Sequence, residues 1–236
     1  MTRGVPLELL CLDLAGTTVA DDGLVEAAFA VALDEVGVPR DGAERQTMEE
    51  RVAATMGTSK LEVFGDLLGD GARAERANRA FEAAYEGLVR RGDLHPIAGV
   101  QGTLLAARQL GLKLVFTTGF SPATRDLVLA TLGWVDAADL ALSPADAGRG
   151  RPFPDMILTA VLRLQVSDVA AVAVAGDTWA DMAAGRRAGA SLVVGVLSGA
   201  DRRQRLVEGG ATHVLPSVAD LPPLLATEAH DGPGLR

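Results

Sequence analysis

Residues 7–19 read LELLCLDLAGTTV, an apolar run that delivers one acid, Asp13, and then a turn of small residues and threonines. An apolar run of this length is typical of a strand buried on both faces of a parallel sheet. Similar runs follow in LKLVFTT (112–118), AAVAVAG (170–176) and SLVVGVL (191–197), and a weaker one in ADLALS (138–143). Residues 7–14 therefore predict the first strand of such a sheet.

Helical patterns alternate with these strands. They cover GVQGTLLAARQLG (99–111), PDMILTAVLRLQ (154–165) and DMAAGRRAGA (181–190). Strands and helices in alternation are the signature of a doubly wound parallel α/β sheet, a Rossmann-like arrangement. We therefore assign the chain to the α/β class.

The segment between the first two strands is far too long for one crossover, and it has helical periodicity throughout. Helices are expected at 24–37, 43–57, 61–69 and 72–92, each followed by or ending in a glycine. We predict an inserted small α-helical cap domain at 21–95, and an α/β core made of 1–20 and 96–236. The tail from Glu228 has breakers and little apolar content, so we expect it to fray.

Composition narrows the range of partners. The chain has 236 residues, 48% of them hydrophobic, and a formal net charge of -9. The acidic balance disfavours nucleic acid and anionic membrane surfaces as partners. We expect a soluble cytoplasmic protein, because MTRGVPLELL lacks the apolar core of a signal peptide and no stretch approaches the roughly 20 apolar residues of a membrane span. Cys11 is the single cysteine, and we expect it to be a buried thiol.

The chemistry should lie where the strands end, because open parallel sheets bind ligands at the carboxyl ends of their strands. The residues there are polar: Asp13 after the first strand, Thr117, Thr118 and Gly119 after the second, Arg149 and Arg151 after the weak strand, and Asp177 with Asp181 after AAVAVAG.

Three carboxylates that converge on one crevice repel one another and favour a bound cation. No His or Cys accompanies them, which favours Mg²⁺ over zinc or copper. With an arginine and threonine hydroxyls, such a site could neutralise a phosphoryl group while Asp13 attacks its phosphorus. Each acid taken alone could equally be a helix cap or a turn residue.

Taken together, the set resembles the haloacid dehalogenase superfamily of aspartate-nucleophile hydrolases. The resemblance rests on DLAGTT (13–18), TTG (117–119), Arg151 in GRPFPD and GDTWADM (176–182). It implies that Asp13 is the nucleophile and that Asp13, the backbone carbonyl of Ala15 and Asp177 hold Mg²⁺. It also implies an auxiliary role behind the metal for Asp181, and phosphoryl binding by Thr117 or Thr118 with Gly119 and by Arg151.

Ala15 departs from most phosphatases of the superfamily, which have an aspartate there as general acid and base. The phosphonoacetaldehyde hydrolase branch is similar at this point, since it shares D-x-A-G-T-T, the arginine of G-R-P-x-P and a cap lysine that forms a Schiff base. MGTSK, residues 56–60, resembles the stretch that carries this lysine. The resemblance therefore makes Lys60 the imine-forming residue.

The chemistry of carbon–phosphorus bond cleavage links Ala15 with Lys60. Breaking a carbon–phosphorus bond expels a carbanion unless a neighbouring iminium accepts its electrons, and then no acid at residue 15 is needed. A lysine forms an imine and an arginine does not, and of the 22 Lys and Arg residues only Lys60 and Lys113 are lysines. We expect a desolvated Lys60 with a depressed pKa, and a structural role for Lys113.

Two departures and two alternatives stay open. Val63 and Phe120 stand where the branch has a histidine and a tyrosine, so its proton relay is not carried over.

An alternative function is that of a phosphomonoesterase acting on a small phosphorylated metabolite, in which Asp21 or Asp22 would be the acid. A third possibility is a non-catalytic binding protein. The expected partner is a small phosphonate or phosphate, and the apolar first cap helix is compatible with a homodimer.

Overall fold

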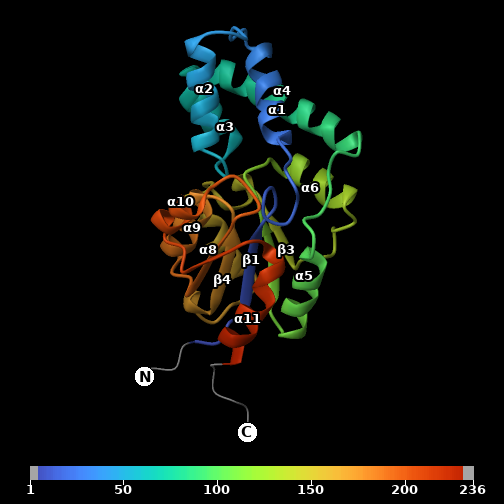
Figure 1. Cartoon of the computed structure of the whole chain (residues 1–236), viewed down its shortest axis with the longest axis vertical. Coiled ribbons are helices and arrows are strands. Elements are labelled where there is room, and N and C mark those ends of the chain that lie inside the picture. Colours follow the sequence, from blue (N-terminus) through green and yellow to red (C-terminus); the bar gives the residue numbers. More distant parts are fainter. Residues whose placement is uncertain (1–4, 231–236) are drawn as a thin grey trace.

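The structure is a computed structural model that describes residues 5–230. Its core is a six-stranded parallel sheet in the order β3-β2-β1-β4-β5-β6 (Figure 1). The strands are β1 (Leu9–Asp13), β2 (Lys113–Thr117), β3 (Leu140–Leu142), β4 (Val172–Gly176), β5 (Leu192–Val196) and β6 (His213–Leu215). The predicted α/β fold class is confirmed, and the weak run at 138–143 forms the edge strand β3.

The first strand lies at the centre of the sheet, between β2 and β4. All five of its residues are buried, as expected for a strand covered on both faces. Leu10 and Leu12 pack into one apolar layer, and Leu9 and Cys11 into the other. The two layers are the two faces of a doubly wound sheet, and Cys11 is the buried thiol expected from its place in the run.

Helices cover both faces of the sheet (Figure 1). The helices of the core are α5 (Val100–Gln109), α6 (Pro122–Thr131), α7 (Pro144–Ala147), α8 (Asp155–Arg163), α9 (Trp179–Ala188), α10 (Arg203–Gly209) and α11 (Leu221–His230). Short 3₁₀ turns lie at Val169–Ala171 and Val218–Asp220. Helices α8, α9 and α10 contribute to the layer of Leu9, while α5 and α11 contribute to that of Leu10.

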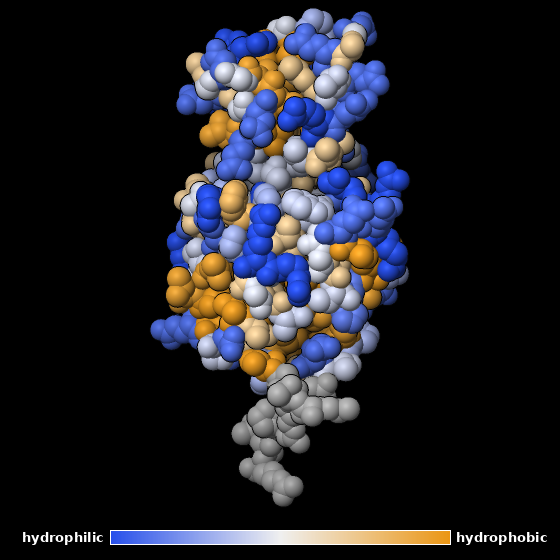
Figure 2. Space-filling view, turned by 90° about the vertical axis from the view of Figure 1, so that its left-hand side faces the viewer, coloured by the Kyte–Doolittle hydropathy of each residue, from blue (hydrophilic) through white to orange (hydrophobic). Residues whose placement is uncertain are grey.

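Four further helices form a separate layer beyond the carboxyl ends of the strands (Figure 1). They are α1 (Leu24–Glu35), α2 (Ala43–Ala54), α3 (Lys60–Leu68) and α4 (Gly71–Arg90). We call this layer the cap. Its interior is built on aromatic contacts, with the Phe29 ring centre 4.9 Å from the ring centres of both Phe64 and Phe81. In Figure 2 the cap is an upper lobe joined to the larger core through a narrower waist.

Two chain segments cross the waist side by side. The amide of Ala20 donates to the carbonyl of His95 at 2.9 Å, and Ile97 donates to Thr18 at 2.9 Å. The outgoing and returning segments are therefore tied together where the cap meets the core. The domain limits at 20/21 and 95/96 fall within this paired segment and stay a prediction.

The carboxyl-terminal part differs from expectation. Helix α11 continues to His230, so residues 228–230 are helical where we predicted fraying; Leu221 and Leu225 anchor this helix in the core. The rest of the predicted tail lies outside the described residues. Within residues 5–230, no helix combines the length and the apolar character needed to cross a membrane.

Candidate active site

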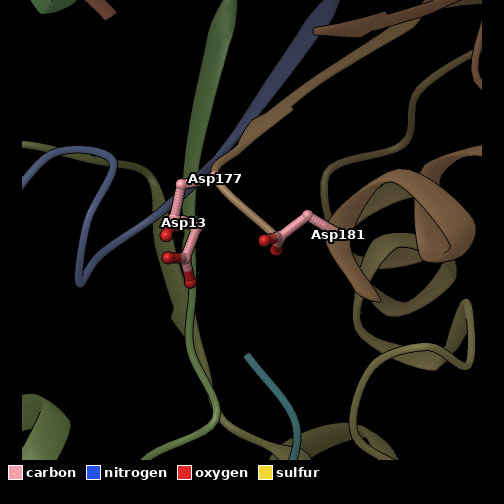
Figure 3. Close-up of side chains that lie close together, drawn as sticks. All are labelled: Asp13, Asp177 and Asp181. Carbon is pink, nitrogen blue, oxygen red and sulfur yellow. The ribbon is translucent and has the colours of Figure 1, made fainter. Parts of the chain in front are cut away.

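Three acidic side chains converge at the carboxyl ends of the two central strands (Figure 3). Asp13 is the last residue of β1, Asp177 directly follows β4, and Asp181 lies in the first turn of α9. One carboxylate oxygen from each lies within 4.8 Å of the others, and all three residues are buried. The structure thus brings together the acids that the sequence placed at separate strand ends.

The turn after β1 explains why its residues are small. Gly16 has φ +82°, and a Cβ there would lie 2.4 Å from Asp177 Oδ2, so only glycine fits this close approach. The Thr17 hydroxyl donates to Asp177 Oδ1 at 3.0 Å, and the Thr18 hydroxyl donates to the carbonyl of Asp13 at 2.8 Å. The AGTT segment therefore fixes Asp13 and Asp177 relative to each other.

Further donors hold Asp181 and Asp177. Thr178 is the N-cap of α9, and it forms a reciprocal capping box with Asp181. Asp177 Oδ2 accepts a hydrogen bond from the amide of Ala200 at 2.8 Å. Part of the negative charge of each acid is thus stabilised by backbone or hydroxyl donors.

Arg151 is the single basic residue in hydrogen-bonding contact with these acids within the described chain. Its Nη1 donates to Asp13 Oδ1 at 2.5 Å and also contacts Asp181. The guanidinium is buried, and its Nε has no hydrogen-bond partner among the described groups. Arg149 instead pairs with Asp155, the first residue of α8, at the surface, so of the two predicted arginines only Arg151 reaches the site.

The acids are held in an environment that disfavours their charge. Burial raises the pKa of Asp13 well above its usual range; Arg151 opposes this rise, and Asp181 and Asp177 add to it. Burial, and then Asp181, raise the pKa of Asp177 to about 7. One arginine leaves three carboxylates under-neutralised, and a bound cation would relieve the excess charge.

The donor set fits Mg²⁺. It consists of oxygen atoms alone, as this cation prefers. The carbonyl of Ala15 accepts no hydrogen bond from the described residues, and Ala15 lines the same cavity as Asp13 and Asp177. The carbonyl oxygen of Ala15 thus has no competing hydrogen-bond donor among the described residues, and its role as a metal ligand stays a prediction.

The residues at the end of β2 differ in whether they line the cavity. Thr118 and Gly119 line the cavity, but Thr117 does not; it is the sheet partner of Asp13 in the register of β1 and β2. The Thr118 hydroxyl accepts a hydrogen bond from the amide of Phe120 at 3.2 Å. Of the two threonines that we considered, Thr118 is therefore the better placed to bind a ligand.

Lys60 reaches this cavity from the cap. It is the first residue of α3, one residue earlier than the predicted helix, and its exposed fraction is only 7%. Its Nζ lies 5.7 Å from the ring centres of both Phe29 and Phe120, and it forms no hydrogen bond or ion pair with another described residue. Burial, and then the charge of Arg151, lower its pKa to about 8. The expected depression of the pKa is thus present.

The other lysine is in a different environment. The Lys113 ammonium donates to the carbonyl of Leu164 at 2.6 Å and lies at the start of β2. It holds two chain segments together, which agrees with the structural role expected for it.

The cavity itself is small. Its volume is about 20 Å³, roughly the space of one water molecule. A groove of about 310 Å³ lies next to it between the cap and the core, and Lys60, Gly119 and Phe120 line both spaces. A substrate therefore needs some separation of cap and core to reach the carboxylates.

Two residues around Lys60 were missed from the sequence. Val25 lines the cavity, as do Met56 and Gly57 of the MGTSK segment, and the ring of Tyr85 lies 4.6 Å from that of Phe120. Val25 and Tyr85 belong to helices far from Lys60 in the sequence, so no spacing could reveal them. A weak signal existed for Tyr85, because it is the only tyrosine in the chain.

Comparison with known proteins shows the family. A family model described as haloacid dehalogenase-like hydrolase matches residues 7–189. Phosphonoacetaldehyde hydrolase of Bordetella pertussis is 31% identical, with 95% of this chain and 93% of the relative covered. The enzyme of the same name from Bacteroides fragilis is 29% identical, with 93% and 95% covered.

Solved structures give the same fold. A hydrolase from Pseudomonas syringae aligns with a TM-score of 0.80 at 26% identity, covering 93% of this chain and 98% of that one. A phosphonoacetaldehyde hydrolase-like protein from Oleispira antarctica has a TM-score of 0.82 at 24% identity, covering 97% and 95%. A predicted phosphoglycolate phosphatase from Haemophilus somnus has a TM-score of 0.77 at 18% identity, covering 92% and 97%. The fold thus extends to relatives of more than one named activity.

Proposed function

The chain belongs to the haloacid dehalogenase-like hydrolases, and we propose that within this family it cleaves the carbon–phosphorus bond of phosphonoacetaldehyde or a close 2-oxoalkylphosphonate. The observation that carries the proposal is the position of Lys60, a buried lysine that lines one cavity with Asp13 and Ala15. The relatives named phosphonoacetaldehyde hydrolase support it.

Lys60 begins the reaction. As the free amine it attacks the substrate carbonyl, and loss of water leaves an iminium that links substrate and enzyme. The pKa of about 8 keeps part of Lys60 in the amine form near neutral pH. The Phe29 and Phe120 rings, each 5.7 Å from Nζ, favour the positive charge of the iminium through their π faces.

Asp13 carries out the second step. Its carboxylate attacks phosphorus, the carbon–phosphorus bond breaks, and the electron pair of that bond moves into the iminium to give an enamine. Arg151 neutralises charge on the phosphoryl oxygens, and Thr118 lies beside them. Mg²⁺ bound by Asp13, Asp177 and the Ala15 carbonyl would supply further neutralisation of the phosphoryl group.

Lys60 and Asp13 are then regenerated. The enamine takes a proton on carbon, and hydrolysis of the resulting iminium releases acetaldehyde from Lys60. Water attacks the phosphorus of the aspartyl phosphate and frees phosphate and Asp13. Because the enamine accepts the electrons of the broken bond, no acid is needed where Ala15 stands.

A borohydride experiment tests the proposal. The protein is incubated with Mg²⁺ and phosphonoacetaldehyde, phosphate and acetaldehyde are measured, and borohydride is added before peptide mass spectrometry. We expect equal release of both products and a reduced adduct on Lys60. The two lysines fall in different peptides, so the Lys113 peptide is an internal control. Turnover of phosphate monoesters in preference, with no adduct on Lys60, would instead support the phosphomonoesterase alternative.

A further inference from the structure

The groove beside the active-site cavity takes no part in the steps described above. Its volume is about 310 Å³, against about 20 Å³ for the cavity that Asp13 and Ala15 line. Sites that bind small molecules begin at roughly 300 Å³, so the groove has room for a substrate group. Phosphonoacetaldehyde does not fill it, because its two carbon atoms and its phosphoryl group are used between Lys60 and Asp13.

Lys60 connects the groove with the cavity. It lines both spaces, and Gly119 and Phe120 of the core do the same. The exposed fraction of Lys60 is 7%, and its ammonium forms no hydrogen bond or ion pair with another described residue. A buried amine without a partner thus lies where the two spaces meet, and a substrate bonded to it can extend into both.

The bonding of the iminium assigns one substituent to each space. Besides the Lys60 nitrogen, the iminium carbon carries two substituents. The methylene that bears phosphorus must point into the cavity, because Asp13 lies there. The other substituent is a hydrogen atom in an aldehyde and a carbon chain in a ketone. Since the cavity has space for about one water molecule, such a chain has to extend into the groove.

The cap wall of the groove offers a hydrogen-bond acceptor that is held in place. Asn78 and Glu82 lie one turn apart on α4, and both line the groove. The Asn78 amide donates to Glu82 Oε1 at 3.2 Å, while Glu82 Oε2 has no partner among the described groups. Glu82 is half-buried. Its second oxygen is therefore left for a donor in the groove, such as a hydroxyl group.

The charges on this wall disfavour an anionic chain. Glu62, two residues after Lys60 on α3, also lines the groove, and among the described residues of the lining Lys60 is the only cationic one. Neither Glu62 nor Glu82 forms an ion pair with a described residue. A carboxylate on the chain would thus meet two like charges with no arginine to offset them. A hydroxyl would instead donate to a carboxylate, which is a strong hydrogen bond.

We propose that the groove is a second substrate subsite, that the enzyme accepts 2-oxoalkylphosphonates with a hydroxyl on the chain beyond the carbonyl, and that Glu82 accepts a hydrogen bond from this hydroxyl.

This proposal rests on the proposed function, because the chain reaches the groove from a substrate bonded to Lys60. The bonds that form and break are the same as with the aldehyde. The phosphoryl group passes to Asp13, the electron pair of the carbon–phosphorus bond enters the iminium, and the enamine takes a proton on carbon. Hydrolysis then releases a hydroxylated methyl ketone from Lys60 and phosphate from Asp13.

Three ketones that differ in one group test the subsite. They are 3-hydroxy-2-oxopropylphosphonate, 2-oxobutylphosphonate and 3-phosphonopyruvate, which carry a hydroxymethyl, an ethyl and a carboxylate group beyond the carbonyl. The kcat/KM for phosphate release is measured for each ketone in the presence of Mg²⁺. Phosphonoacetaldehyde is measured in parallel, together with the borohydride adduct on Lys60. Ratios between ketones are compared across variants, so that the intrinsic reactivity of each ketone cancels.

Two substitutions of Glu82 separate its acceptor from its charge. Glu82→Ala removes the acceptor, so the hydroxymethyl-to-ethyl ratio should fall by on the order of tenfold. Glu82→Gln keeps the acceptor for Asn78 and removes the charge, so the carboxylate-to-ethyl ratio should rise severalfold. Glu86→Ala and Glu86→Gln are the matched controls, because Glu86 lies on the next turn of α4, pairs with Arg90 and does not line the groove. Both ratios should keep their wild-type values in these controls.

The results separate the subsite from the proposed function. If wild type cleaves phosphonoacetaldehyde with an adduct on Lys60 but releases phosphate from none of the ketones, the subsite is wrong and the proposed function stands. If the ketones are cleaved but the hydroxymethyl-to-ethyl ratio is the same in wild type and Glu82→Ala, or falls equally in Glu86→Ala, the role of Glu82 is wrong. If wild type gives neither phosphate nor adduct with phosphonoacetaldehyde, both proposals fail together.

Discussion

The ammonium of Lys60 lies 5.7 Å from the centre of the Phe120 ring, so a cap helix and a core loop meet at the one lysine of the cavity. This lysine is buried without a carboxylate in salt-bridge contact. Its charge is therefore held at a cost to the stability of the fold, and that cost can be measured.

Lys60→Met is expected to stabilise the protein. The pKa of Lys60 falls from 10.5 to about 8 on folding, so between these values the unfolded chain binds more protons than the folded one and stability rises with pH. Below pH 8 the full penalty applies, about 3 kcal/mol. Urea unfolding should show Lys60→Met to be more stable at pH 7, with a difference that shrinks toward pH 10.

Lys113→Met provides the matched comparison. This substitution removes the hydrogen bond to the Leu164 carbonyl, so it should destabilise the protein by about 1 kcal/mol. Equal changes in the free energy of unfolding for the two substitutions would contradict the interpretation that the buried charge of Lys60 destabilises the fold.

Lys60→Arg tests the amine itself. Arginine keeps the positive charge but cannot form the imine, so phosphate release from phosphonoacetaldehyde should fall by on the order of 10⁴-fold or more. In wild type, release should rise with pH until about pH 8, where the amine form becomes dominant. Lys113→Arg should retain wild-type turnover, and comparable losses in both variants would point to a general effect of the larger arginine side chain on the fold.

Mg²⁺ is expected to raise the melting temperature. At a hundredfold excess over its dissociation constant the gain is about 2.7 kcal/mol, or roughly 5–10 °C for a chain of this size. The carboxyl of Asp177 must be ionised to bind the ion, so affinity should increase as the pH rises through about 7. Calorimetric titration at several pH values measures this dependence.

Without the metal, the raised pKa of Asp177 should make the protein less stable as the pH rises. The folded state binds a proton at Asp177 that the unfolded state has lost, so stability should decrease as the pH rises from about 4 to about 7. Asp177→Asn should abolish the Mg²⁺ shift, whereas Asp70→Asn, at the N-cap of α4, should retain it. A shift that survives Asp177→Asn would place the ion elsewhere.

Gly119→Ala tests the contact between cap and core. A Cβ on Gly119 would lie 2.4 Å from the carbonyl oxygen of Thr58 in the cap, so the two lobes must move apart. An ångström-scale misplacement of Lys60 should reduce turnover by on the order of 10²-fold. Gly102→Ala on α5 meets no atom within 4 Å and should keep full activity; retained activity in Gly119→Ala would show that closure is not limiting.

Much of the core followed from local sequence. Runs such as residues 7–14 are apolar on both faces because two helical layers cover them, and an acid at the end of such a run has few places to lie except the carboxyl edge of the sheet. Strand β6 was missed because it is short and begins with the exposed His213. Helices α6 and α10 were also missed. The apolar residues of α6 are interrupted by polar ones, and α10 has only seven residues.

The surroundings of the site depended on tertiary packing. The cavity joins Val25, Lys60 and Phe120, which belong to three separate elements. Their distances are set by how the cap rests on the core, a relation that no local pattern encodes. The sequence placed Lys60 beside the acids through a motif, but the aromatic rings that desolvate it became visible only in the folded chain.

The hydrogen bond between Lys113 and the Leu164 carbonyl has a protective consequence. Aldehydes condense with exposed lysine amines, so under the proposed function, in which each turnover releases an aldehyde, the protein risks modifying its own surface. Here the second lysine is tied to a carbonyl, and every other cationic Lys or Arg side chain is an arginine, which forms no stable imine. The protein therefore offers an aldehyde few side-chain amines to attack, and it should stay active for a long time in concentrated acetaldehyde.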